Sequence, residues 1–315
     1  VDDPQDVVDR AEQTVFAVAR RASGGREPAD MNLVMGEISH LLDRDREQDG
    51  LPSGYRDLDA LSGGFHGGEL VIVAARPSMG KTALLLNMAE RLALEDVPVA
   101  VFSLEMSRQQ VGQRLWCSYG RFDLRRLRQN MMSGAERRTL EKARQRLRGV
   151  PIYIDDDAGL TVAQLRARAR RLKAAHDVQA VLVDYLQLLQ PTDERANRTV
   201  QVGQMSWGLK ALAKELDVPV IAAAQLNRRV TDRSDFRPRM SDLRESGSIE
   251  QDADLVALLH REDYYHRGEP DYQDSNVTEL IVAKQRNGPT GVVRLSFLQD
   301  CTRFELASCP AGSFQ

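Results

Sequence analysis

The chain has 315 residues and a formal net charge of −3, from 43 basic and 46 acidic side chains. With 42% hydrophobic and 28% charged residues, it falls among globular proteins and outside the disordered, collagen-like and disulfide-stapled classes. Its longest apolar run, residues 70–75, is much shorter than the roughly 18 residues of a membrane span, so no membrane contact is expected. The slightly acidic balance implies that any nucleic-acid contact comes from local basic loops.

The three cysteines, Cys117, Cys301 and Cys309, are far apart and form no CxxC motif. Neither a disulfide nor a cysteine metal site is therefore expected, and the protein is predicted to work in a reducing, intracellular compartment. Because the first residue is Val1 and not Met, we expect the sequence to be a piece of a longer protein.

An amphipathic helix is predicted near the N-terminus. Residues 4–21 place small and β-branched apolar side chains on one helical stripe, after an N-cap at Asp3. A polar stretch, residues 23–30, and a second short helix ending near Leu42 separate this helix from the rest of the chain. The stripe can dock on another chain or domain, or pack within its own domain, and both interpretations stay open.

From Leu51 onward, short β-branched runs alternate with longer helical segments, which is typical of a parallel sheet with crossover helices. The predicted strands are 70–75, 98–102, 151–154, 180–184 and 218–223. The predicted helices are 81–94, 107–118, 134–148, 161–175 and 199–216. Three late runs without long helices between them are predicted to be antiparallel strands closing one edge of the sheet. These runs are 255–259, 278–283 and 292–298.

The strongest motif joins the strand 70–75 to a loop, Arg76-Pro-Ser-Met-Gly-Lys-Thr82, and an apolar helix. In such a loop, backbone N–H groups cradle phosphates, Lys81 reaches the β- and γ-phosphates, and the Thr82 hydroxyl binds Mg²⁺. The strict pattern has glycine where this chain has Ala75, so a chance Gly-Lys-Thr is the alternative. The strand-to-helix context favours nucleotide binding.

Two carboxylates follow predicted strands, where ligands of open α/β sheets gather. Asp184 suits a contact to Mg²⁺ or its water, and Glu105 suits a base that polarises the attacking water. Isolated acidic residues at strand ends are usually solvated loop starts. Because both occur beside a phosphate loop, we favour the catalytic interpretation.

Gln225 ends the buried run 218–225 and is placed to sense the γ-phosphate and pass its presence to the loop beyond. That loop, residues 228–240, has five arginines, including Arg228 and Arg229, against two aspartates. A solvated loop is the alternative, but beside a nucleotide sensor we predict a contact to a phosphodiester backbone.

A cationic pair, Lys284 and Arg286, ends the late run that begins at Glu279. Residues two apart on a strand point to the same side. Facing the nucleotide of an adjacent subunit, Arg286 would act as an arginine finger with Lys284 beside it. From periodicity alone, ordinary cations at a strand end are the commoner case.

Several ordered motifs together resemble the family of the bacterial replicative DNA helicase, DnaB. These are Arg76–Thr82, Phe102–Met106, Asp184–Leu188, Gln225–Arg228, Asp242–Asp254 and Ala283–Gly291. The resemblance runs from about Val1 to Leu298, and Ala75 is usual in this family. The opening helix resembles the family's linker helix, which docks on a neighbouring subunit, whereas the family's N-terminal helical domain is absent.

The resemblance implies a RecA-like P-loop NTPase, an α/β fold with a mostly parallel central sheet, antiparallel strands at its C-terminal edge and a preceding linker helix. It implies a linker helix and hinge at 1–30, an ATPase domain at 31–306 and a tail at 307–315. The implied assembly is a homo-hexamer that hydrolyses ATP with Mg²⁺ at subunit interfaces. It moves 5′ to 3′ on single-stranded DNA and unwinds the replication fork in the cytoplasm.

The resemblance also assigns roles. Lys81, Glu105, Asp184, Gln225, Arg286 and Lys284 are expected to be catalytic, the last two acting on the neighbour's ATP. Residues expected to bind the nucleotide are Arg76, Pro77, Ser78, Met79, Gly80, Lys81, Thr82, Ala83 and Arg114, with Thr82 and Asp184 at the metal. Residues expected at DNA from the resemblance are Arg244, Glu245 and Gly247, to which the basic loop after Gln225 adds Arg228 and Arg229. The implied partners are a helicase loader, the clamp loader, and primase, mainly through the absent domain.

Three other classes share some of these features. A RecA-like recombinase shares the phosphate loop and both carboxylates, but the segments 242–254 and 283–291 disfavour it. A non-motor module that binds ATP for assembly or loader docking would not be stimulated by DNA. A circadian-clock type of ATPase shares the glycine-rich approach 61–68, but such proteins usually carry duplicated domains, and this chain has one phosphate loop.

Overall fold

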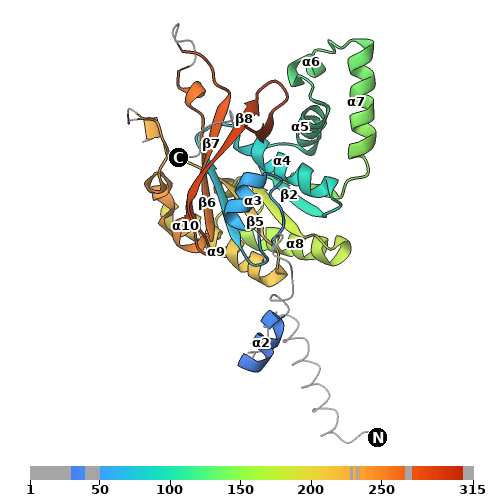
Figure 1. The fold of residues 1–315 in the computed structure, drawn as a ribbon. Coiled ribbons are helices and arrows are strands. Elements are labelled where there is room, and N and C mark those ends of the chain that lie inside the picture. The colour runs from blue at the N-terminus through green and yellow to red at the C-terminus, as the bar shows by residue number, and fades with distance from the viewer. Residues whose placement is uncertain are drawn as a thin grey trace, which may run out of the picture. The chain divides into compact units, whose positions relative to one another are not determined.

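The computed structural model describes residues 30–39, 50–227, 230–231, 233, 235–266 and 272–307 (Figure 1). The chain divides into two units, residues 1–47 and 48–315. The described part of the first unit is helix α2 (Met31–Ser39), where the Asp30 carboxylate accepts a hydrogen bond from the Leu33 N–H at 2.8 Å. The predicted helix at 4–21 lies outside the described residues, and the predicted division at residue 30 stays a prediction.

The second unit is built on a sheet whose described strands lie in the order β3-β2-β4-β5-β1-β6-β7-β8-β9. The strands are β1 (Leu70–Ala75), β2 (Val99–Ser103), β3 (Ile152–Asp155), β4 (Ala180–Asp184), β5 (Val220–Gln225), β6 (Leu255–His260), β7 (Val277–Gln285), β8 (Gly291–Leu298) and β9 (Arg303–Leu306). Neighbours from β3 to β6 are parallel, and those from β6 to β9 are antiparallel. The predicted α/β class with an antiparallel C-terminal edge is confirmed.

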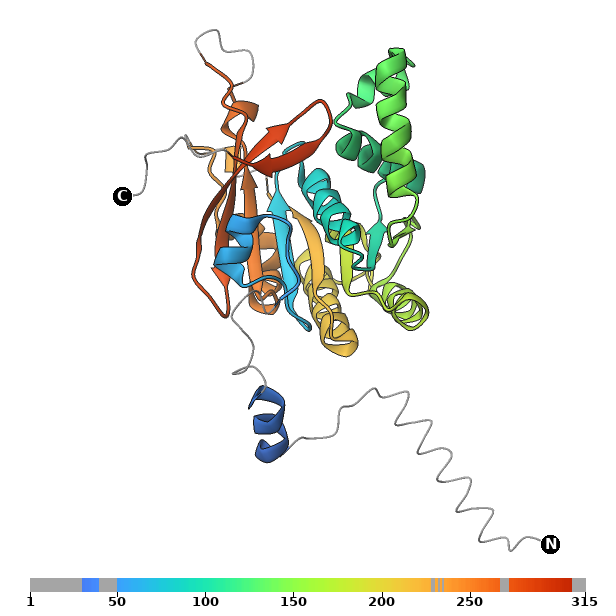
Figure 2. The same cartoon turned by 45° about the vertical axis from the view of Figure 1, so that its right-hand side comes forward.

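Helices cover both faces of this sheet (Figure 2). They are α3 (Arg56–Ser62), α4 (Lys81–Leu94), α5 (Arg108–Gly120), α6 (Leu124–Arg128), α7 (Gly134–Leu147), α8 (Val162–His176), α9 (Arg198–Leu216) and α10 (Gly247–Asp252). Alternate residues of β1 enter two cores, Val71 and Val73 packing with α4, and Leu70 and Ile72 packing with α8 and α9. β1 is therefore buried on both faces, as its unbroken apolar run indicates.

One strand is paired differently from the prediction. Run 255–259 was expected among the antiparallel strands, and β6 is indeed antiparallel to β7, but it is parallel to β1 on its other side. The connection from β5 to β6 crosses over through α10, which has six residues, so no long helical pattern marks the parallel crossover. The four-residue strand β9 and the short helices α3 and α6 were not predicted.

Strand β9 fastens the last edge of the sheet to α4. The Phe304 N–H donates to Asn87 Oδ1 at 2.8 Å, and Arg91 donates to the Phe304 carbonyl at 3.0 Å. Arg303 pairs with the fully buried Glu90 at 2.5 Å, which compensates a charge that would otherwise be costly to bury. The Phe304 ring is fully buried and lies 4.4 Å from the ring of Phe297. Residues far apart in sequence are thereby joined beneath the phosphate loop.

Phe304→Ala is expected to lower the free energy of unfolding by about 3–5 kcal/mol, because it removes a buried ring and leaves a cavity that the rigid sheet can fill only in part. Urea denaturation followed by circular dichroism measures this change. The control is Val292→Ala on β8, a side chain that is 46% exposed and should change stability by no more than about 0.5 kcal/mol. Equal effects of the two substitutions would contradict this packing role.

Candidate nucleotide-binding site

The phosphate loop lies between the end of β1 and the start of α4. Gly80 caps α4 with a φ of +101°, and a Cβ there would lie 2.9 Å from Phe304 Cζ. Both the backbone conformation and the space therefore require glycine. Ala75, in contrast, is the last residue of β1 and pairs with Gln225 and Leu259 in regular strand register. An extended strand residue accommodates a methyl group, which explains why alanine replaces the glycine of the strict motif.

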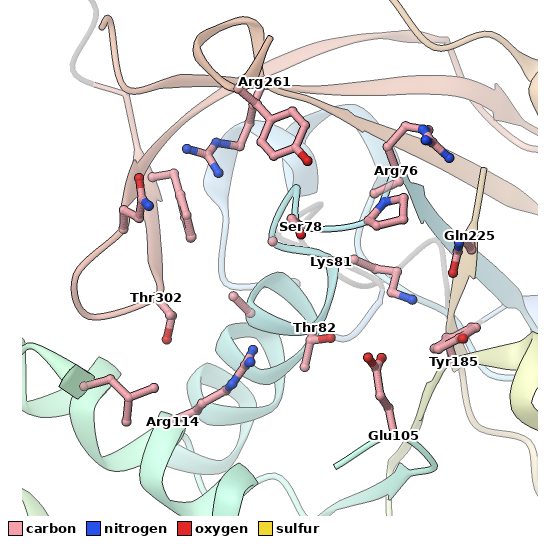
Figure 3. Close-up of a pocket in the computed structure, with 18 of the residues that line it drawn as sticks. Arg76, Ser78, Lys81, Thr82, Glu105, Arg114, Tyr185, Gln225, Arg261 and Thr302 are labelled. Carbon is pink, nitrogen blue, oxygen red and sulfur yellow. The ribbon is translucent and has the colours of Figure 1, made fainter. Parts of the chain in front are cut away.

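A pocket of about 520 Å³ opens over this loop (Figure 3). The predicted site residues that line it are Arg76, Pro77, Ser78, Gly80, Lys81, Thr82, Ala83, Glu105, Arg114 and Gln225. Met79, also predicted to contact the nucleotide, is 1% exposed and packs in the core. Residues separated by up to about half of the chain thus converge on one cavity.

Lys81 and Asp184 face each other at the floor of the site. The Lys81 Nζ lies 3.7 Å from Asp184 Oδ1 and 3.8 Å from the centre of the Tyr185 ring. Burial lowers the pKa of Lys81, against the opposing effect of the Asp184 charge. Both Asp184 carboxylate oxygens are buried, and neither accepts a hydrogen bond from any described residue. A buried carboxylate without such a partner beside the phosphate loop fits a magnesium ion or its water shell.

Glu105 and Arg114 approach from β2 and α5. The Glu105 side chain is exposed to the pocket, as a group that handles a water molecule must be. Arg114 has a buried Nε without a hydrogen-bond partner among the described residues, and burial lowers its pKa. An arginine stays charged in proteins, so this guanidinium is suited to an anionic ligand.

Hydrogen bonds from a neighbouring side chain fix the backbone of Gln225. The Gln187 side chain accepts from the Gln225 N–H at 3.1 Å and donates to its carbonyl at 3.3 Å. Two residues on, the Asn227 N–H donates to the Asp242 carbonyl at 3.1 Å. The strand that carries Gln225 is therefore joined directly to the segment that precedes Arg244.

The opposite wall of the pocket was not predicted. Besides Tyr185, the unpredicted lining residues are Leu124, Arg125, Arg261, Tyr264, Phe297, Gln299, Asp300 and Thr302. Figure 3 shows Arg261 and Thr302 across Thr82 from Glu105, Tyr185 and Gln225. The Arg261 guanidinium lies 4.4 Å from the centre of the Phe297 ring, a cation–π contact that shapes this wall. No local motif marks these residues, because Leu124 and Arg125 come from α6 and the others from β8 or the segments beside β6, β8 and β9, which meet only in the folded chain.

Lys284 and Arg286 lie at the other end of the sheet. Gln285 pairs with Leu255, which pairs with Val71 near the start of β1, whereas the phosphate loop follows the end of β1. At about 3.3 Å per residue, the five residues from Val71 to Arg76 span roughly 16 Å. The pair is therefore remote from the pocket of its own chain, and Arg286 comes just after β7 rather than within it.

The predicted DNA residues fall in two groups. Arg244 and Glu245 lie in the 3₁₀ segment Met240–Ser246, and Gly247 begins α10. Arg228 and Arg229 lie outside the described residues. The Asp242 carboxylate, two residues before Arg244, is bound by the guanidinium of Arg233 at 2.6 Å.

The described residues contain no cluster of three or more His, Cys, Asp or Glu side chains arranged to hold a metal ion. This is compatible with magnesium, which commonly takes one or two protein oxygens together with substrate phosphates. None of the helices that the structure describes has both the length and the apolar composition needed to cross a membrane.

Comparison with protein families matches residues 50–306 to the DnaB-like helicase C terminal domain. The replicative DNA helicase DnaB of Geobacillus stearothermophilus is 42% identical, over 98% of this chain and 70% of that protein. The replicative DNA helicase DnaC of Bacillus subtilis (strain 168) is 42% identical, over 96% of this chain and 67% of that protein. The similarity thus extends on both sides of the matched domain and leaves about a third of each relative unmatched.

Two solved structures have the same fold. One, described as an ATPase domain, superposes with a TM-score of 0.84 at 35% identity, over 90% of this chain and 100% of that chain. A structure described as a DnaB-like replicative helicase and its interactions with primase gives a TM-score of 0.82 at 35% identity, over 95% of this chain and 73% of that one.

Proposed function

Because the chain belongs to the DnaB-like helicase family and is an ATP-hydrolysing replicative DNA helicase, we propose that six copies form a ring that moves 5′ to 3′ on single-stranded DNA and hydrolyses ATP between subunits. The observation that carries this proposal is the distance between the phosphate loop and the cationic pair of one chain. A remote cationic pair can complete a nucleotide site only if that site belongs to another subunit.

In the proposed reaction, a water oxygen attacks the γ-phosphorus of ATP while the bond to the β,γ-bridging oxygen breaks, giving ADP and phosphate. Glu105 accepts the proton of the attacking water. Lys81 and Arg114 stabilise the negative charge of the phosphates, with the loop N–H groups. Thr82 and Asp184 would hold Mg²⁺, whose chemistry is to neutralise phosphate charge.

The sensing step is proposed to start at Gln225. Its amide would contact the γ-phosphate, and its backbone leads to Asn227 and so to Asp242. Loss of the γ-phosphate would then alter the segment that carries Arg244. This path supports a coupling between the nucleotide state and the grip on DNA. Gln225 and Asn227, and likewise Asp242 and Arg244, are two residues apart in sequence, and a hydrogen bond joins Asn227 to Asp242.

Arg244, Glu245 and Gly247 are proposed to grip successive phosphates of single-stranded DNA, using one cation and backbone N–H groups. Such contacts do not read bases. A motor that moves along any sequence requires this kind of contact. Arg228 and Arg229 are proposed to add positive charge near the same strand.

Arg244→Ala is expected to weaken single-stranded DNA binding about equally for all base compositions and to reduce the slope of log K against log salt by about 1. Fluorescence anisotropy with oligonucleotides of different composition, over a series of salt concentrations, measures both effects. The exposed Arg137 of α7 provides the control substitution to alanine. A loss confined to particular bases would contradict the proposed backbone grip.

The proposed partners follow from the family. Primase binding is supported by the similar helicase structure described with primase, and we propose that it uses mainly the region of the relatives that this chain does not match. A helicase loader and the clamp loader are further proposed partners at the replication fork, in the cytoplasm. Residues 1–30 are proposed to dock on a neighbouring subunit, ahead of an ATPase domain that ends near residue 306.

The test is steady-state ATP hydrolysis with and without single-stranded DNA, on protein whose mass is determined with Mg²⁺ and a nucleotide analogue. Hydrolysis stimulated by DNA in a hexamer is the expected result. Hydrolysis that ignores DNA would favour a module that binds ATP without acting as a motor. DNA-bound filaments in place of rings would favour a recombinase.

A further inference from the structure

Asp254 lies at the end of the sheet opposite the phosphate loop, immediately before β6. Its side chain is 8% exposed. Its carboxylate accepts hydrogen bonds from the Leu70 N–H at 2.8 Å, Lys210 Nζ at 2.6 Å and Arg286 Nη1 at 3.2 Å. Its backbone N–H donates to the Leu70 carbonyl at 2.9 Å, and its carbonyl accepts from the Arg286 N–H at 2.8 Å. One residue therefore joins the first residue of β1, α9 and the end of β7.

The cations around Asp254 are also bound to backbone carbonyls. Arg286 donates to Gln251 O at 2.9 Å, and Lys284 donates to Ala253 O at 2.6 Å and to Glu250 O. Carbonyls at the end of a helix carry partial negative charge, so the end of α10 attracts these cations. Burial and the Arg286 charge lower the pKa of Lys284.

This arrangement fixes Arg286 without burying it. The two side-chain bonds use two of its five N–H donors, and 50% of the side chain remains exposed. A long side chain held at both terminal guanidinium nitrogens, Nη1 and Nη2, is preorganised for a ligand outside its own chain. The Asp254 charge offsets the repulsion between the cations it binds, Lys210 and Arg286, and favours the charged form of the nearby Lys284.

We propose that Asp254 is a positioning residue for hydrolysis, which holds Arg286, beside Lys284, in the geometry that the neighbouring subunit's nucleotide requires. This inference rests on the proposed action of Arg286 between subunits. Asp254 also connects that cation to β1, which leads to the phosphate loop of its own chain, and to α10, which begins at Gly247 in the proposed DNA grip. A shift of α10 on DNA would therefore move the cationic pair of the same subunit.

The test uses Asp254→Asn, which keeps an acceptor for the Leu70 N–H but removes the charge that holds Arg286. DNA-stimulated hydrolysis is expected to fall by about 10²-fold, since a small misplacement of a catalytic group has an effect of that order. Affinity for a fluorescent ATP analogue and the mass of the assembly should not change. The control is Asp177→Asn, an exposed residue that pairs with Lys173 at 2.9 Å, and this variant should keep the full rate.

Mixed assemblies separate positioning from folding. Subunits with Asp254→Asn keep an intact phosphate loop, so mixing them with Lys81→Ala subunits should restore part of the activity, whereas mixing them with Arg286→Ala subunits should not. Asp254→Glu keeps the charge but displaces it, and should show the same pattern with a smaller loss. This second variant keeps the test informative if Asp254→Asn folds poorly.

Three outcomes would overturn the positioning role of Asp254 or the action of Arg286 between subunits. A full rate in both Asp254 variants, with a large loss in Arg286→Ala, would overturn the positioning role and leave the proposed function intact. Loss of activity in a folded Asp254→Asn assembly that Lys81→Ala subunits cannot restore would make the role structural. A full rate in Arg286→Ala itself would instead overturn the proposed action between subunits.

Discussion

Lys81→Ala is expected to reduce ATP turnover by at least about 10²–10³-fold, the range associated with removing one preorganised donor from a transition state. The Lys81 ammonium is buried beside Asp184, and its lowered pKa reflects the removal of solvent rather than a strong ion pair. A desolvated cation at the end of a phosphate loop acts most strongly where charge develops on the γ-phosphoryl group. A coupled assay for ADP release measures the turnover.

The control for this variant is Lys173→Ala, which removes a partly exposed lysine from α8 and should leave turnover unchanged. The mass of the Lys81→Ala assembly should equal that of the parent protein, which would show that the loss is chemical. Turnover near the parental rate in Lys81→Ala would disprove the assignment of the phosphate loop.

Strand β1 and its loop could be predicted because all their determinants are local. An unbroken apolar run, a glycine at the loop's end and a Lys-Thr pair at a helix start are contiguous in sequence. The ends of β2 and β4 could be predicted for a similar reason, since strands of a parallel sheet end at the same edge and bring Glu105 and Asp184 toward Lys81. The structure places both carboxylates there.

The far wall of the pocket could not be predicted, because its residues come from elements whose neighbours are set by tertiary pairing. Thr302 precedes a strand of four residues that has no distinct periodicity, and Phe297 reads as an ordinary core residue of β8. The parallel pairing of β6 escaped prediction for the same reason. Short crossovers leave little pattern, although they decide which strands become neighbours.

The role of Arg286 depends on where the fold places it as well as on its residue type. The family resemblance predicts an arginine finger at this position, whereas its spacing from Lys284 is equally compatible with an ordinary cation at a strand end. The antiparallel course of β7 returns the chain to the N-terminal ends of the parallel strands, away from its own phosphate loop. That course, together with the contact to Asp254, makes an action between subunits testable.

Arg286→Ala is expected to reduce hydrolysis by about 10³–10⁵-fold, the range attributed to arginine fingers. Binding of a nucleotide analogue should be retained, because Lys81, Thr82 and Arg114 belong to the opposite subunit of the shared site. The two properties are measured separately, by ADP release and by fluorescence of a labelled analogue. Loss of analogue binding equal to the loss of hydrolysis would contradict a role specific to the transition state.

Mixing distinguishes an action between subunits from an action within one. In a ring with head-to-tail interfaces, an Arg286→Ala subunit contributes an intact phosphate loop. A neighbouring Lys81→Ala subunit can contribute an intact Arg286 to the same interface. In random assemblies of equal amounts, half of the phosphate loops are intact, and half of those face a neighbour with an intact Arg286. About a quarter of the interfaces should therefore regain activity. If Arg286 acted within its own chain, every subunit in the mixture would carry one defect, and no ratio of the two variants would restore hydrolysis.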